Sequence, residues 1–93
     1  MVDLTARNLA MSTAMALAHG RSGDRERQLA SERVQARSRE LLGQLEPLAV
    51  KGRLEVLLAA ARDGVGDDVG FLERWGYDQE QRQAIAQAVQ SVA

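Results

Sequence analysis

The chain has 93 residues, enough for one small domain. It contains no cysteine, which excludes disulfides, thiolate catalysis and sulfur-ligated metal sites. Its formal net charge is −1, so it has no overall positive field that would hold nucleic acid or an anionic membrane. The hydrophobic fraction of 45% overstates the core, because 15 of those residues are alanine, whose burial removes little area from water.

Arginine makes up all but one of the 12 basic residues, the exception being Lys51. Together with the excess of alanine, this usage is typical of GC-rich coding and suggests a bacterium or one of its phages as the source. No apolar run approaches the roughly 18–20 residues that a membrane-spanning helix needs. We therefore expect a cytoplasmic protein that does not associate with a membrane.

The hydrophobic periodicity is helical throughout, and no segment alternates as a strand does. It predicts a single all-α domain over residues 1–93, a small bundle of four to five helices without strands. The predicted helices span residues 3–19, 24–46, 47–62, 68–75 and 79–92.

The first predicted helix, 3–19, is apolar over most of its circumference and is expected to end at Gly20. Met11 and Met15 lie on one face, where their adaptable side chains predict a surface for a partner protein. A second face carries small residues that let another helix approach closely, and we expect it to form a homodimer interface. The dimer-interface candidates on this face are Ala6, Ala10, Ala14 and Leu17.

The second predicted helix, 24–46, is heavily charged, and Asp24 or Ser22 is expected to cap its start. Its apolar residues recur at a spacing close to a heptad over barely three repeats, which allows a coiled coil without requiring one. The stripe expected to be buried consists of Ala30, Val34, Ser38, Leu41, Leu45 and Leu48.

Arginines at the start of this helix and along it are candidates for contacts with nucleic-acid phosphates. On a helix they scatter around the circumference among glutamates, whereas a nucleic-acid-binding helix concentrates positive charge on one side. Nucleic-acid binding is therefore the alternative interpretation. Its candidate residues are Arg21, Arg25, Arg33, Arg37 and Arg39.

The later connections carry clear turn and cap signals. Pro47 should end the second helix and begin the third. One of the two aspartates at 67 and 68 is expected to cap the short fourth helix, and Gly76 to end it. Asp78 and Gln81 have the spacing of a capping box at the start of the last helix.

The only three aromatic residues are Phe71, Trp75 and Tyr77, all within seven positions. Phe71 and Trp75 are one helical turn apart and are expected to dock the short helix onto its neighbours. Tyr77 is expected to contact Leu72 and so close the helix end. The outer edges of Trp75 and Tyr77 are candidates for a partner surface, since these residue types dominate binding hot spots.

Side chains for chemistry are scarce. His19 is the only histidine, and a serine or threonine nucleophile usually needs such a base beside it. Asp63, Asp67 and Asp68 surround two glycines, but their spacing does not match a calcium loop, and helix capping explains them better. We therefore predict no enzyme activity and no catalytic, cofactor-binding or metal-binding residue.

The function that we expect is non-catalytic protein–protein interaction. The chain would act as an adaptor, a co-chaperone or an inhibitor of a larger bacterial or phage component, and would form a homodimer. The scarcity of chemical groups, the apolar first helix and its methionines favour this hypothesis. The alternative is a nucleic-acid-binding regulator or packaging factor that uses the arginine-rich second helix.

Overall fold

The structure is a computed structural model and describes residues 1–92 of the chain. These residues form five helices and no strand. The helices are α1 (Val2–Arg21), α2 (Arg25–Gln44), α3 (Pro47–Asp63), α4 (Val69–Arg74) and α5 (Gln79–Val92). The predicted all-α bundle of four to five helices is confirmed, and no helix end differs from its predicted position by more than two residues.

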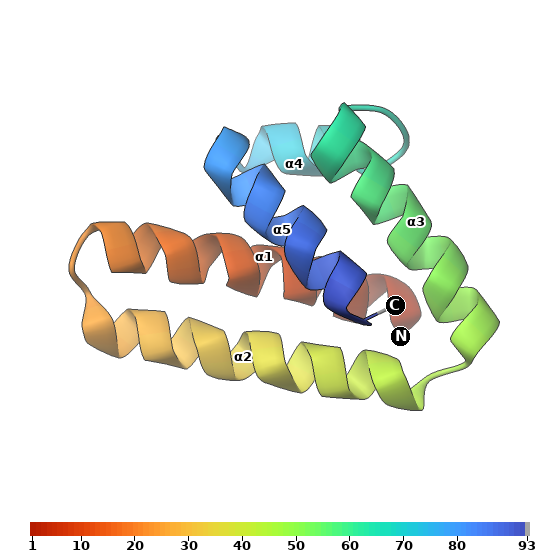
Figure 1. The fold of residues 1–93 in the computed structure, drawn as a ribbon, viewed down its shortest axis with the longest axis horizontal. Coiled ribbons are helices and arrows are strands. Elements are labelled where there is room, and N and C mark those ends of the chain that lie inside the picture. The colour runs from red at the N-terminus through yellow and green to blue at the C-terminus, as the bar shows by residue number, and fades with distance from the viewer. Residues whose placement is uncertain (93) are drawn as a thin grey trace.

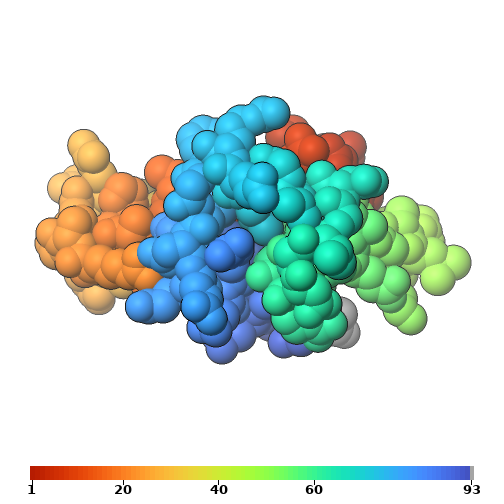
Figure 2. Space-filling model, turned by 90° about the horizontal axis from the view of Figure 1, so that it is seen from above, coloured from red at the N-terminus to blue at the C-terminus, as the bar shows by residue number. Residues whose placement is uncertain are grey.

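The helices α1 and α2 form an antiparallel hairpin along the long axis of the molecule (Figure 1). From the end of α2, α3 turns away, and α5 returns across α1 and beside α3 (Figure 1). Seen from above, the α1–α2 turn and the α2–α3 corner project at opposite ends of a body that measures 38 × 27 × 18 Å (Figure 2). Helix α1 packs against α2, α3 and α5.

The turn between α1 and α2 differs slightly from the expected one. Helix α1 continues through Gly20 and ends at Arg21, and the left-handed residue of the turn is Gly23, with φ of 76°. Asp24 then caps α2 as expected, because its Oδ1 accepts a hydrogen bond from the Arg27 amide at 3.1 Å. Asp24 and Gly23 together therefore define the hairpin.

The corner between α2 and α3 is built from Glu46 and Pro47. Pro47 occupies the first turn of α3, as predicted, where its missing N–H has no helical partner to lose. The Glu46 carboxylate accepts hydrogen bonds from the amides of Leu48, at 3.2 Å, and Ala49, at 2.7 Å. This side-chain cap, which the sequence analysis missed, fixes the direction in which α3 leaves the hairpin.

The end of α4 has the predicted geometry. Gly76 is left-handed, with φ of 66°, and the Tyr77 amide donates to the Leu72 carbonyl at 3.4 Å, which is the long bond of a Schellman ending. Asp78 and Gln81 then form the expected capping box, with reciprocal hydrogen bonds of 3.0 and 2.8 Å.

The core lies where α1, α3 and α5 meet, with α2 and α4 adding one leucine each. Its largest fully buried apolar side chains are Leu9, Leu42, Leu57, Ile85 and Val89.

The alanine face of α1 belongs to this core, which corrects its assignment to a dimer interface. Ala6, Ala10 and Ala14 have 0% exposure. They allow close approach by α5, whose Gln81 donates from Nε2 to the Ala14 carbonyl at 3.1 Å. Because the chain's own helices cover the three alanines, a second copy cannot reach them. Leu17, the fourth candidate, is half-buried.

Candidate functional site

The helix α2 packs on α1 through a different face from the one that its apolar pattern predicts. The face turned toward α1 carries residues at heptad spacing, Gln28, Ser31, Gln35, Ser38, Leu42 and Leu45, all buried or half-buried. Ala30, Val34 and Leu41, from the expected stripe, are exposed instead. Leu48, also expected to be buried, is exposed at the start of α3. Ser38 and Leu45 belong to both the expected stripe and the observed face, so α2 is rotated by less than the 100° that separates successive residues.

Small hydroxyl residues on α1 explain why this shifted contact is stable. Ser12 donates from Oγ to the Asn8 carbonyl at 2.7 Å. Thr13 donates from Oγ1 to the Leu9 carbonyl, also at 2.7 Å. A hydroxyl that is satisfied within its own helix can be buried without a partner in the neighbouring helix. The two helices can therefore pack closely at Ser12 and Thr13, and Ala30, Val34 and Leu41 of α2 stay at the edge of the contact.

A shallow groove of about 260 Å³ runs along that edge. It is lined by Asn8, Met11, Ser12, Met15, Ala30, Ser31 and Val34, and we call it the α1–α2 groove. Its apolar walls are open to solvent, since Met15 is 45% exposed and Val34 is 48% exposed. Met11 is half-buried beside them. The structure thus brings the two methionines together with α2 residues that the sequence analysis had assigned to the interior.

The exposed apolar surface continues beyond the groove. Leu4, seven residues before Met11, is 61% exposed, and Leu41, seven residues after Val34, is 37% exposed. Seven residues make about two helical turns, so each leucine lies on the same face as its counterpart. Because α1 and α2 are antiparallel, both leucines extend the apolar surface toward the same end of the hairpin.

The arginines proposed for nucleic acid fall into three groups in the structure. Arg21 pairs with Asp78 at 2.6 Å and Glu80 at 3.1 Å, and so joins the end of α1 to the start of α5. The other four are exposed on α2. At about 100° per residue, Arg33 and Arg37 flank the open side of Val34, whereas Arg25 and Arg39 lie on the far side of the helix. The structure does not gather these five residues onto one surface.

The aromatic residues are also placed differently from expectation. Trp75 is 54% exposed, whereas Phe71 and Tyr77 are partly buried against the core. The buried residue of α4 is Leu72, and Trp75 is the residue that follows the last helical position. Burial raises the pKa of the Tyr77 hydroxyl. Tyr77 is therefore the packing residue and Trp75 the exposed one, which corrects the expectation that Trp75 docks α4.

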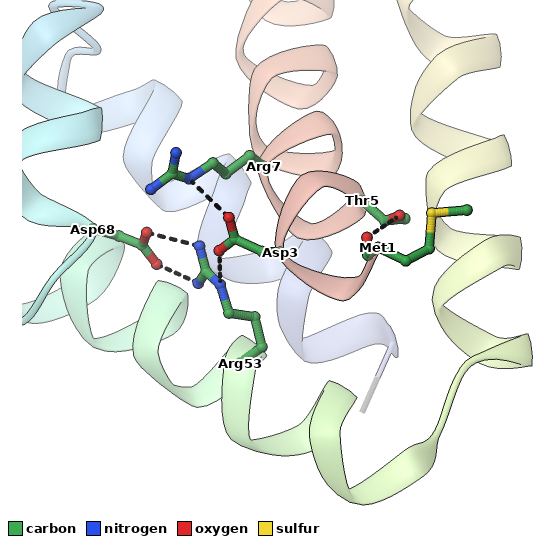
Figure 3. A network of polar contacts seen from close by, with 6 residues as sticks. All are labelled: Met1, Asp3, Thr5, Arg7, Arg53 and Asp68. Carbon is green, nitrogen blue, oxygen red and sulfur yellow. Dashed lines mark hydrogen bonds and ion pairs between the residues drawn. The ribbon is translucent and has the colours of Figure 1, made fainter.

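An ion-pair network fixes the start of α1 against α3 and α4 (Figure 3). Arg53 holds Asp68 with two hydrogen bonds, Nη1 to Oδ2 at 2.5 Å and Nη2 to Oδ1 at 2.9 Å. Its Nε donates to Asp3 at 2.7 Å, and this bond lowers the pKa of the Asp3 carboxyl. Arg7 lies 4.0 Å from Asp3 and 5.2 Å from the centre of the Phe71 ring. The network sets the position of α1, and with it one wall of the groove.

The buried pair of this network was not recognised in the sequence. Asp67 or Asp68 was expected to cap α4. Asp68 occupies the N-cap position, but its carboxylate makes no capping bond and pairs with Arg53, with the side chain only 2% exposed. The available signal was Arg53 itself, which lies on the buried side of α3 beside Leu57 and Ala60. An arginine in that position requires an acidic partner.

Two other classes of site are not found in the part of the chain that the structure describes. Within residues 1–92, no group of three or more His, Cys, Asp or Glu side chains is placed to hold a metal ion. No helix in that range combines the length and the apolar character needed to cross a membrane.

Fold and groove define a small all-α protein with an open apolar groove between its two longest helices. The family model described as Uncharacterised conserved protein UCP020893 matches residues 1–92, and the chain belongs to this family. Neither the curated proteins nor the solved structures contain a match to the chain. The family match gives no function, so the function has to be inferred from the groove.

Proposed function

We propose that the protein is a non-catalytic interaction protein and that the α1–α2 groove binds another protein. One observation carries the proposal: of the five exposed large apolar residues of α1 and α2, Met15 and Val34 line the groove and Leu4 and Leu41 extend it, whereas Leu29 alone lies elsewhere, about 140° round α2 from Val34. Single exposed apolar residues are normal on a protein surface, but contiguous apolar surface marks interaction sites. The role of the complex, as adaptor, co-chaperone or inhibitor of a larger bacterial or phage component, is part of the proposal, as is a cytoplasmic location.

The chemistry of the groove supports this proposal. Met11 and Met15 are flexible and polarisable, which suits a surface that adapts to a partner. Burying the exposed half of a side chain such as Val34 or Met15 contributes on the order of 1 kcal/mol to binding before the costs of association. Several such residues lie side by side here, so a partner covering the groove would gain a useful apolar contact.

The proposal is tested by affinity capture with a variant that blocks the groove. In Val34→Glu, the new carboxylate would lie on the groove wall, where a partner would have to desolvate it. The matched control is Ala36→Glu, which adds the same charge at an exposed position about 200° round α2. We expect wild type and Ala36→Glu to capture the same partner from lysate of the source organism, and Val34→Glu to lose it while keeping its circular dichroism. Equal capture by both variants would contradict the proposal.

The nucleic-acid alternative stays a prediction, and no arrangement of the arginines favours it. Arg21 is already occupied by two carboxylates, and the exposed arginines of α2 lie on opposite sides of the helix. Electrophoretic mobility shift at low salt tests it directly, because phosphate contacts are strongest there.

A further inference from the structure

We propose that most of α2 undocks from α1 as a unit while the rest of the fold stays intact. The segment that undocks comprises residues 25–40, and we call it the α2 arm. The proposal follows from the contacts that hold each helix in place, and it does not depend on the proposed function. One wall of the α1–α2 groove, formed by Ala30, Ser31 and Val34, belongs to the arm, so the groove exists only while the arm is docked.

The arm buries very little apolar surface. Its only buried residue is Ser38, and its large apolar residues, Leu29 and Val34, are exposed. The half-buried residues that it turns toward α1 are Gln28, Ser31 and Gln35. Because hydrophobic stabilisation is roughly proportional to the apolar area removed from water, docking the arm on α1 gains little from this term.

The surface of α1 beneath the arm carries a row of small residues. Ser12, Ala16 and Gly20 recur every four residues and so lie on one face of α1. Ser12 lines the groove together with Ser31, and a Cβ atom added at Gly20 would lie 3.4 Å from the side chain of Gln28, which places this face against the arm. The two helices approach closely there, but the side chains that meet are small or polar.

Polar side chains do not tie the arm to another helix within residues 1–92. The polar contacts of its side chains are local there, between Arg27 and the capping residue Asp24 and between Gln28 and Glu32. Figure 1 shows α2 along one edge of the molecule, where α1 is its main neighbour. The arm can therefore leave α1 without breaking a hydrogen bond or an ion pair between helices.

The chain is fixed on both sides of the arm. Before it, Arg21 at the end of α1 pairs with Asp78 at 2.6 Å, which holds the α1–α2 turn near the start of α5. After it, Leu42 is 1% exposed and belongs to the core together with Val50 of α3. These two anchors define where the undocking segment begins and ends.

The helix α5 has the opposite character and serves as the internal reference. Ile85 and Val89 are 0% and 2% exposed, and Gln81 donates to the Ala14 carbonyl of α1 at 3.1 Å. We therefore expect α5 to open only when the core unfolds. An isolated helix as short as the arm is marginal in water, so the arm's own backbone hydrogen bonds open once it leaves α1, and its amide protons can exchange.

The test is native-state amide hydrogen exchange of the full chain, followed by NMR at several low urea concentrations. After correction for intrinsic rates, the amides of residues 29–40 should exchange at least about tenfold faster than those of residues 85–90, because local opening requires less free energy than unfolding. Urea should accelerate exchange less in the arm than in α5, since undocking exposes less surface. Equal protection and equal urea dependence in the two helices would overturn the proposal. Fast exchange confined to the first turn of α2 would be fraying of its end and would also overturn it.

Two variants test whether the contact with α1 controls the undocking. Gln35→Leu places an apolar side chain of similar size at a half-buried position facing α1, and should slow exchange in the arm by about three- to tenfold while leaving α5 unchanged. The matched control Ala36→Leu adds a leucine at the next position, which is exposed, and should leave both helices unchanged. Circular dichroism checks the fold of each variant and light scattering its mass. If Gln35→Leu slows exchange in the arm no more than Ala36→Leu does, the contact with α1 does not control the opening, and the proposal is wrong.

Discussion

On the side of α1 that faces α3 and α5, Ala6, Ala10 and Ala14 are fully covered by other helices of the chain. On the side beside α2, Met15 and Val34 are about half exposed, whereas Ser12 and Ser38 in the contact between the two helices are buried. Both sides of α1 are rich in apolar residues, so composition does not distinguish them. What distinguishes them is whether another helix of the same chain completes the packing.

Because of this difference, we expect the covered side of α1 to contribute to folding stability and the open side to contribute to binding. A fully buried residue contributes its transfer free energy to folding, whereas a half-exposed one retains part of that contribution for a partner. Substitutions on the covered side should therefore change the free energy of unfolding. Substitutions on the open side should change binding and leave folding nearly intact.

The largest expected effect on stability comes from introducing an aspartate on the covered side of α1, compared with an aspartate introduced beside the open groove. In Ala10→Asp, a charge would be placed at a position with 0% exposure and no basic partner, which costs several kcal/mol. We expect this variant to be unfolded at 25 °C by circular dichroism. Val34→Asp, on the open side, should change the free energy of unfolding by no more than about 0.5 kcal/mol in urea titration.

This pair also tests the role of the alanine face. If Ala10→Asp stayed folded and only changed the mass measured by light scattering, the alanines would form an interface between copies, and the packing described for α1 would be wrong.

The next largest loss of stability is expected when the ion pair between Arg53 and Asp68 is broken. Asp68→Asn removes the negative partner of Arg53, whose side chain is only 15% exposed. Breaking a buried pair costs about 3–5 kcal/mol, and since Asp3 would still hold Arg53, we expect about 2–3 kcal/mol in urea titration. Asp67→Asn is the matched control at an exposed neighbour and should have little effect. Equal losses in the two variants would show that the pair does not stabilise the fold.

A smaller loss of stability is expected when the aromatic residues are truncated. The structure predicts that Tyr77 matters more than Trp75, which is the opposite of the order suggested by the sequence. Tyr77 packs partly against the core, so Tyr77→Ala should lower the free energy of unfolding by about 1–2 kcal/mol. Trp75 is 54% exposed, and Trp75→Ala should change it by no more than about 0.5 kcal/mol. Thermal melts of both variants measure the difference. A larger loss in Trp75→Ala would mean that its ring packs against α4 in solution.

The sequence was sufficient for the features that depend on neighbours in the chain. Helix ends depend on residues a few positions apart, and the cap at Asp24, the start at Pro47 and the turn at Gly76 all follow the predicted chemistry. The one misplaced stop, at Gly20, arose because a glycine can also continue a helix when a later glycine supplies the left-handed turn.

The sequence was insufficient where the outcome depends on distant packing. The apolar pattern of α2 places Val34 and Leu41 in one buried stripe with Ser38, yet of these three only Ser38 is buried, because α1 presents small residues that allow a close contact there. Nothing near Ser38 in the sequence reports what α1 presents. The same limit applies to Trp75 and Tyr77, whose exposure depends on how α4 lies across the core. The candidate groove therefore became visible only in the structure.

The smallest effect is a dependence of stability on pH from the two exposed ends of α1. The hydrogen bond from Arg53 lowers the pKa of Asp3, and the hydrogen bonds from Arg21 and the Gln81 amide lower that of Asp78. A carboxyl whose pKa is lower in the folded state stabilises the fold above its unfolded value, about 3.9, and loses this contribution as pH falls through the folded value. Stability should therefore decrease below about pH 4, measured as the urea midpoint at pH 5 and pH 3. Because Asp78→Asn removes one of these titrations, its midpoint should fall less than that of wild type between the two pH values. A midpoint that falls equally in both proteins would show that Asp78 is not held by Arg21 in solution.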